Sequence, residues 1–176
     1  MNEQFHAYLQ KVSKDALKGF TRREFEVKSC APESLTYYQY LATVIIGSSE
    51  NKILLTVHFW EDDAAVLTVD PRKILEKSVR RDIFKEYLNI FSSRIKNAAA
   101  QAGLDVGISL PFTVPGYQSC FVINSKVYKT TYCWELIRNK SRIGFGCSLV
   151  LNDPGLMQKM IEYQDLRSQD NELEIL

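Results

Sequence analysis

Residues 79–103, VRRDIFKEYLNIFSSRIKNAAAQAG, predict one long amphipathic helix, and this helix limits most strongly how the chain can fold. At about 100° per residue, one broad stripe of the helix collects apolar side chains, namely Phe84, Tyr87, Leu88, Phe91, Ile95, Ala98, Ala99 and Ala102. An apolar stripe of this width has to be buried against other elements. We therefore expect it to face the core.

The opposite side of the predicted helix carries a short row of polar side chains, namely Asp82, Glu86, Asn89 and Ser93. Residues three and four apart stack on a helix, so the row spans only about 60°. Such a row is most often only a solvated face. Two features favour a contact surface instead. Asn89 stands mid-helix, where asparagine costs about half a kcal/mol relative to alanine, and Ile83 and Ile90 border the row although they lie off the apolar stripe.

Length and charge place the chain among ordinary globular proteins. Its 176 residues are 45% apolar and carry 22 basic against 21 acidic side chains, which predicts one domain over residues 1–176 with a buried core. A net charge of +1 gives no electrostatic basis for binding nucleic acid. We also expect no membrane association and a cytoplasmic location, since the apolar runs are short and the N-terminus lacks a signal-peptide pattern.

Other catalytic chemistries find little support in the sequence. The four cysteines, Cys30, Cys120, Cys133 and Cys147, are widely spaced and form no metal-binding pattern, so we expect reduced, mostly buried thiols. His6 and His58 are the only histidines, and neither has an evident nucleophile beside it. The glycines form neither a phosphate-binding loop nor a dinucleotide-binding turn. Nucleophilic catalysis and nucleotide binding are therefore not expected.

The rest of the chain predicts an α+β protein, in which helices dominate the first half and consecutive strands the second. The predicted helices cover residues 1–18, with Gly19 as the stop, a short segment opened by Pro71 with Asp70 as its N-cap, and 156–168 before a polar tail. Residues 61–69 suit a short helix with acidic residues in its first turn, although the VLTV within them would also suit a strand. The predicted strands cover residues 20–28, a hairpin of 37–47 with 52–60, and then 106–111, 119–125, 127–137 and 142–151, with a turn at Asn139 and Lys140.

The polar row also carries a family resemblance. Asp82, Glu86 and Asn89, with Pro111 downstream, follow the spacing of a motif in the CheC/CheX/FliY phosphatases of bacterial chemotaxis. The segment 107–116, GISLPFTVPG, is similar to the strand and proline-broken turn that follow the motif helix in that family. The resemblance covers residues 1–151 and is closest to the CheX-like branch, because the chain has a single Glu-x-x-Asn. The helix predicted after residue 151 lies outside it.

The resemblance implies a fold, a reaction and roles for these residues. The fold would be an antiparallel sheet covered by long amphipathic helices, and the activity would be hydrolysis of the aspartyl phosphate on a CheY-type response regulator. Glu86 would pair with a lysine of the regulator and Asn89 would orient the attacking water. Asp82 would support docking, together with Ile83, Ile90 and Ser93 at the partner surface, and Pro111 would shape the neighbouring strand end.

The resemblance also bears on cofactors and assembly. The Mg²⁺ would be carried by the regulator, so the protein would need no metal or cofactor of its own. Some members of the family pair their sheets into dimers, which leaves a homodimer open here. A rival interpretation is a non-catalytic adaptor or dimerising module of a two-component system that keeps the fold and the exposed row.

Overall fold

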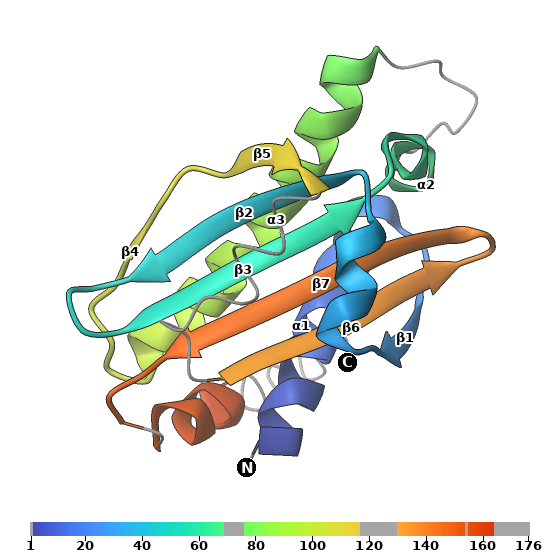
Figure 1. Ribbon diagram of the computed structural model, residues 1–176. Helices are drawn as coiled ribbons and strands as arrows, with labels where there is room; N and C mark the ends of the chain where they lie inside the picture. The colour runs from blue at the N-terminus through green and yellow to red at the C-terminus, as the bar shows by residue number, and fades with distance from the viewer. Residues whose placement is uncertain (1, 69–75, 117–129, 154, 164–176) are drawn as a thin grey trace, which may run out of the picture.

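The computed structural model describes residues 2–68, 76–116, 130–153 and 155–163, and it confirms the α+β prediction (Figure 1). Within these residues an antiparallel seven-stranded sheet has the order β1-β6-β7-β3-β2-β4, and β5 also pairs with β2. The strands are β1 (Glu26–Ser29), β2 (Tyr40–Gly47), β3 (Lys52–Phe59), β4 (Gly107–Ile108), β5 (Phe112–Pro115), β6 (Thr130–Arg138) and β7 (Ser141–Val150). The helices are α1 (Asn2–Thr21), α2 (Ala64–Leu67) and α3 (Lys77–Gln101), with 3-10 helices η1 (Pro32–Tyr37) and η2 (Glu61–Asp63). Residues 155–163 are also helical.

Helices α1 and α3 cover one face of the sheet, which we call the core face (Figure 1). Every residue of the predicted apolar stripe on α3 is buried, which confirms that prediction. Two hydrogen bonds tie α1 into this layer. The Tyr87 hydroxyl donates to the Ser13 carbonyl over 2.9 Å, and the Trp134 indole donates to the Ser13 hydroxyl over 2.9 Å. Side chains from both helices and from the central strands therefore build one continuous core.

The other face of the sheet, the outer face, is covered in part by η1 (Figure 1). Gly144 of β7 allows η1 to lie close to the sheet, and Gly146 makes room for Thr56 of the neighbouring β3. A Cβ on Gly144 would stand 2.6 Å from a methyl carbon of Leu35, and a Cβ on Gly146 would stand 2.5 Å from the Thr56 hydroxyl. Neither contact is tolerable without movement. The absence of a side chain at Gly144 is thus what lets η1 pack directly on the sheet.

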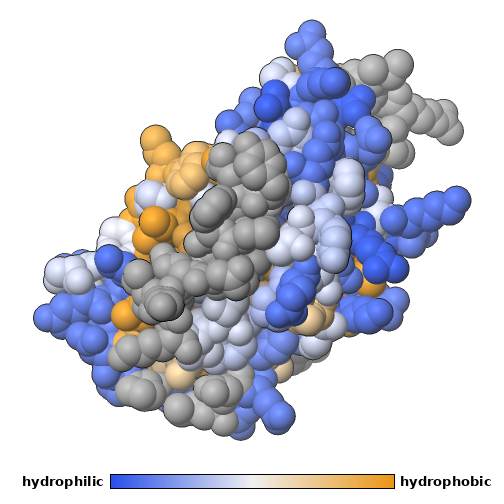
Figure 2. Space-filling model, viewed as in Figure 1, coloured by the Kyte–Doolittle hydropathy of each residue, from blue (hydrophilic) through white to orange (hydrophobic). Residues whose placement is uncertain are grey.

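The sheet edge formed by β4 and β5 exposes apolar side chains. Figure 2 shows hydrophobic residues gathered over this edge. The exposed apolar residues there are Ile45, Ile108, Leu110 and Phe112. The segment 109–111 that joins β4 to β5 is held to β2 by the Ser109 amide, which donates to the Ile45 carbonyl over 2.9 Å. The edge is therefore ordered although it is apolar and open to solvent.

Several predicted elements match the structure closely. The hairpin of β2 and β3 lies within a few residues of its predicted ends, and residues 61–67 are helical as expected. The turn between β6 and β7 falls at Asn139, whose φ of 56° is a left-handed conformation that asparagine tolerates better than most residues. The predicted strand of 142–151 corresponds to β7.

Other predictions were wrong in their bounds. The first helix does not stop at Gly19 but continues to Thr21, because one glycine costs a helix only about 1 kcal/mol. Arg22 ends it instead, with a φ of 58° and an amide that donates to the Lys18 carbonyl over 2.7 Å. The strand predicted from Phe20 therefore begins only at Glu26.

The segments around η1 and β5 also differ from the sequence prediction. Residues 32–37 form η1, where no helix was expected, and the strand predicted from residue 37 starts at Tyr40. The strand predicted for 106–111 is only the two-residue β4, and the expected turn after it contains β5. The Pro71 helix with Asp70, Cys120, the strand 119–125 and the tail after residue 163 lie outside the described residues. No helix in the described part of the chain is long and apolar enough to span a membrane.

Candidate functional site

The polar row lies on the solvent side of α3, as the helical spacing predicted. Asp82, Glu86 and Ser93 are exposed, and Asn89 is partly buried. The apolar stripe on the opposite side of α3 is fixed against the sheet, so the row is presented on a rigid support. The structure therefore brings these four side chains together along one line of the helix surface.

The members of the row differ in how far their side chains are already engaged. Asp82 forms an ion pair with Lys85, whose Nζ lies 2.6 Å from the Asp82 carboxylate oxygen Oδ1. The side chains of Glu86 and Asn89 make no hydrogen bond or ion pair with any other described residue. The backbone carbonyl of Asn89, by contrast, accepts a hydrogen bond from the Ser92 hydroxyl at 3.1 Å. The exposed Ser93 hydroxyl likewise makes no hydrogen bond with any other described residue. Glu86, Asn89 and Ser93 are thus the members whose polar groups are available to a partner.

Ile83 and Ile90 belong more to the core than the sequence suggested. Both are partly buried and pack against the core cluster. Their place beside the polar row is thus largely explained by packing within this chain. What remains exposed of them forms a narrow apolar margin along the row.

The N-terminal half of α3 is anchored by charged contacts. Arg81 lies 3.5 Å from a carboxylate oxygen of the buried Glu61 and stacks over the Tyr40 ring, 5.4 Å from its centroid. Arg80 pairs with Asp62 at 2.8 Å. These contacts join the turn before the row to η2 and β2. The orientation of the row is therefore set by the sheet edge as well as by the core.

Pro111, the residue expected to shape the strand end near the site, lies between β4 and β5. It is partly buried, whereas its neighbours Leu110 and Phe112 are exposed. Strand β5, which starts just after Pro111, contacts α3. The proline thus separates two short strands beside the helix that carries the row.

The histidines and cysteines lie in surroundings that are typical of structural residues. His58 is buried on the outer face, with Nε2 3.0 Å from the Thr56 hydroxyl, and burial lowers its pKa to about 3. The His6 ring lies 3.2 Å from the Gln10 amide. Cys30, Cys133 and Cys147 are free thiols. Among the described residues no group of three or more His, Cys, Asp or Glu side chains could hold a metal ion.

Sequence reasoning missed a cavity on the outer face, lined by η1, β1, β6, β7 and Trp60. Its residues come from segments far apart in the chain. Trp60 borders the cavity, and half of its surface is exposed. The alternation of β6, which points Glu135 away from the core side, was the one signal that could have drawn attention to this face.

Comparison with known proteins was informative only at the level of structure. No protein-family model matches the chain, and no curated protein sequence matches it significantly. The structure, however, is similar to a chemotactic CheC-like protein from Shewanella oneidensis MR-1, with a TM-score of 0.63 and 14% identity, over 85% of this chain and 99% of the other. The chain has the CheC/CheX fold. The resemblance seen in residues 82–116 is thereby confirmed for the architecture.

Two further structures show how widely this fold is used. A chain of the CheX–CheY–BeF3–Mg complex from Borrelia burgdorferi matches with a TM-score of 0.60 and 12% identity, over 81% of this chain and 96% of the other. A chain of the FliM–SpeE complex from H. pylori matches with a TM-score of 0.56 and 10% identity, over 91% of this chain and 95% of the other. At these identities the CheC/CheX fold is what the protein shares with them.

Proposed function

We propose that the protein binds a phosphorylated CheY-type response regulator and accelerates hydrolysis of its aspartyl phosphate. The observation that carries the proposal is the state of Glu86 and Asn89. On a helix fixed in the CheC/CheX fold, these two side chains stand one turn apart and are not engaged by other described residues. Their spacing is that of the motif found in the CheC/CheX/FliY phosphatases.

Glu86 is the docking residue in this proposal. An ionised carboxylate only accepts hydrogen bonds, so it suits the ammonium group of a lysine on the partner. Asp82, four residues earlier, is already paired with Lys85 at 2.6 Å. Docking therefore relies mainly on Glu86, with Asp82 and Ser93 at the margin of the contact together with the exposed parts of Ile83 and Ile90.

Asn89 is the residue that positions water. Its side-chain amide carries donors and an acceptor in one plane, so it can hold a water molecule and direct it toward a phosphorus atom. Phosphoryl transfer depends mainly on positioning and on charge stabilisation, and the Mg²⁺ and phosphoryl group would both be held by the regulator. A hundredfold acceleration requires about 2.7 kcal/mol, which a single positioned water can supply. No metal site on this chain is needed.

The solved complexes support a protein partner for this fold. A CheX protein is found in a complex with CheY, BeF3 and Mg, and FliM is found in a complex with SpeE. The first supports a CheY-type partner, and in our proposal that partner binds the α3 surface. The second supports the rival proposal, in which the protein is an adaptor that binds a partner and has no phosphatase activity.

The test is the rate of phosphate loss from a radiolabelled CheY-type phospho-regulator of the same organism. We expect the wild-type protein to accelerate the loss. Asn89→Ala should reduce the acceleration at least tenfold while retaining binding, and Glu86→Ala should weaken binding. Asn97→Ala is the matched control, since Asn97 is an exposed asparagine of the same helix outside the motif.

Two outcomes would contradict the phosphatase proposal. If the wild-type protein leaves the rate unchanged but binds the phosphorylated regulator, the adaptor interpretation is correct. If Asn89→Ala and Asn97→Ala accelerate phosphate loss as well as the wild type, any activity arises elsewhere on the surface.

A further inference from the structure

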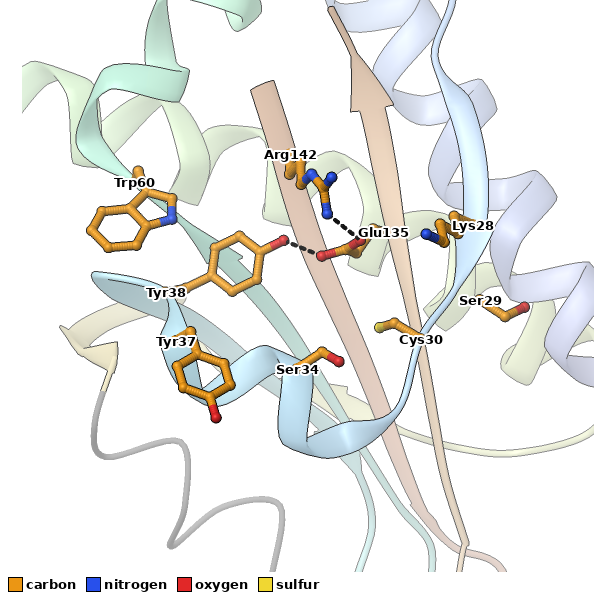
Figure 3. A pocket seen from close by; sticks show the side chains of 9 residues that line it. All are labelled: Lys28, Ser29, Cys30, Ser34, Tyr37, Tyr38, Trp60, Glu135 and Arg142. Carbon is orange, nitrogen blue, oxygen red and sulfur yellow. Dashed lines mark hydrogen bonds and ion pairs between the residues drawn. The ribbon is translucent and has the colours of Figure 1, made fainter. Parts of the chain in front are cut away.

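A cavity of about 540 Å³ opens on the outer face of the sheet, on the opposite side from α3 and its polar row (Figure 3). Its walls are side chains of β1, η1, β6 and β7 and the loop that follows β3. The volume lies within the range of about 300–1,000 Å³ that is typical of sites for small molecules. The cavity is therefore large enough for a ligand and separate from the proposed catalytic surface.

One wall of the cavity is aromatic. Tyr37 and Trp60 are 78% and 50% exposed, although side chains of this size are usually covered. Tyr38 lies between them and the floor (Figure 3). Exposed Trp and Tyr beside a cavity offer flat apolar surfaces on which a ring can stack.

The floor of the cavity is a buried carboxylate that is already satisfied. Glu135 is 7% exposed, and its Oε1 accepts a hydrogen bond from the Tyr38 hydroxyl at 2.7 Å. Arg142 approaches the other carboxylate oxygen with Nη1 at 3.8 Å. Burial and the bond to Glu135 raise the pKa of Tyr38, so its hydroxyl remains the donor. Glu135 therefore needs no further cation.

The rim carries more positive charge than the floor neutralises. Lys28 stands directly opposite Glu135 in the pairing of β1 with β6, yet it makes no ion pair with another described residue. Arg142 is 60% exposed at its side chain and keeps most of its donors free for solvent. Burial raises the pKa of the nearby Cys30 thiol to about 11, so the thiol is neutral at pH 7. The lining residues thus sum to one net positive charge.

We propose that this cavity binds a small organic anion that carries an aromatic ring. Its carboxylate or phosphate group would lie between Lys28 and Arg142, and its ring would lie against Trp60 and Tyr37. Guanidinium groups bind both kinds of anion through paired hydrogen bonds, and the aromatic wall adds apolar contact. The hydroxyl of Ser34 faces the same space and can donate a further hydrogen bond (Figure 3).

Tryptophan fluorescence gives a direct test of this site. The chain has two tryptophans, and Trp134 is fully buried in the core while Trp60 borders the cavity. The full-length protein would be titrated with benzoate, phenyl phosphate, benzylamine and benzyl alcohol. We expect saturable quenching by at least one of the two anions, and at least tenfold weaker binding of the amine and the alcohol. No regulator is present, so the result is independent of the proposed phosphatase activity.

Variants then locate the binding. Lys28→Met with Arg142→Met should weaken binding of the anion at least tenfold. Lys52→Met should leave it unchanged, because Lys52 is an exposed lysine at the end of β3 opposite Trp60. Trp60→Phe should abolish the fluorescence response but keep binding measurable by calorimetry. The proposal is overturned if neither anion binds, if benzylamine binds at least as tightly, or if the double variant binds like the wild type.

Discussion

The two faces of the sheet are built on different principles. On the core face, α1 and α3 bury aromatic and aliphatic side chains, among them Trp134 stacked on Phe145 with ring centres 5.4 Å apart. On the outer face, the buried side chains include Thr56, His58 and Glu135. Strand β7 also carries Gly144 and Gly146 there, where a side chain would collide with its neighbours. The core face supplies most of the apolar burial that stabilises a fold. The outer face instead holds polar groups around a cavity.

This contrast explains where function can reside. The polar row on α3 is exposed because the opposite side of that helix is used entirely for packing. The cavity exists because η1 covers only part of the outer face and brings Tyr37 and Tyr38 over β6 and β7. The polar row therefore lies on the solvent side of the helical layer, and the cavity opens beside η1 on the opposite face of the sheet.

The largest expected effect is on the core face. Trp134→Ala would remove the stack on Phe145 and leave the Ser13 hydroxyl without its donor at 2.9 Å. We expect a loss of about 3–5 kcal/mol in the free energy of unfolding, measured by urea denaturation. Trp60→Ala is the control, and since Trp60 is half exposed its cost should stay below about 1 kcal/mol. Equal costs would mean that the two faces do not differ as described.

A smaller effect is expected where η1 lies on β7. Gly144→Ala places a Cβ within 2.6 Å of Leu35 and 3.1 Å of Tyr38, so η1 has to move. We expect a loss of about 1–3 kcal/mol, which is typical of overpacking, together with weaker binding at the cavity. Gly107→Ala is the control, because its Cβ would meet only the Gly47 carbonyl oxygen at an ordinary 3.8 Å. Unchanged stability in Gly144→Ala would show that η1 does not pack directly on Gly144.

The pH dependence of stability should report on His58. Its pKa is lowered to about 3 in the folded state, mainly by burial and only partly offset by the Leu35 backbone. The unfolded chain binds the proton near pH 6.5, so the unfolded state holds more protons between these values and stability falls as the pH falls. Between pH 6.5 and 5.5 the loss from this group is about 1 kcal/mol. In His58→Gln the loss over that interval should be smaller by that amount, and an unchanged pH dependence would contradict the burial of a neutral imidazole.

The smallest expected change is at the polar row. Asn89→Ala replaces a poor helix former on the outside of α3 and should stabilise the protein by up to about 0.5 kcal/mol. Urea denaturation would be compared with Asn97→Ala, which changes the same residue type on the same helix. A gain in stability together with a loss of phosphatase activity would show that Asn89 serves a partner rather than the fold. A clear destabilisation would mean that Asn89 supports the helix itself.

Periodic patterns were predicted well because they reflect local geometry. The apolar stripe of α3, the hairpin of β2 and β3, and the four members of the polar row all follow from fixed repeats of a helix or a strand. Element ends were predicted less well. Helix α1 passes Gly19 and ends before Arg22, since the burial of Thr21 and the left-handed cap outweigh a single glycine.

The cavity could not be predicted from the sequence, because its residues become neighbours only through strand pairing. Lys28 meets Glu135 when β1 pairs with β6, and Arg142 joins them through the turn between β6 and β7. Nothing in residues 26–38 indicates which distant carboxylate Tyr38 will contact. The packing of the 3-10 helix η1 likewise depends on Gly144 of β7, more than a hundred residues later in the chain.

The sequence by itself determined the α3 helix, its buried stripe and the outward row with Glu86 and Asn89, since a helical repeat fixes which residues share a side. Only the tertiary structure decided that Ile83 and Ile90 pack against the core, that Asp82 is paired with Lys85, and that an aromatic and cationic cavity lies on the other side of the sheet. The reason is physical: periodicity sets the direction of a side chain, whereas the neighbours it meets depend on long-range pairing and packing.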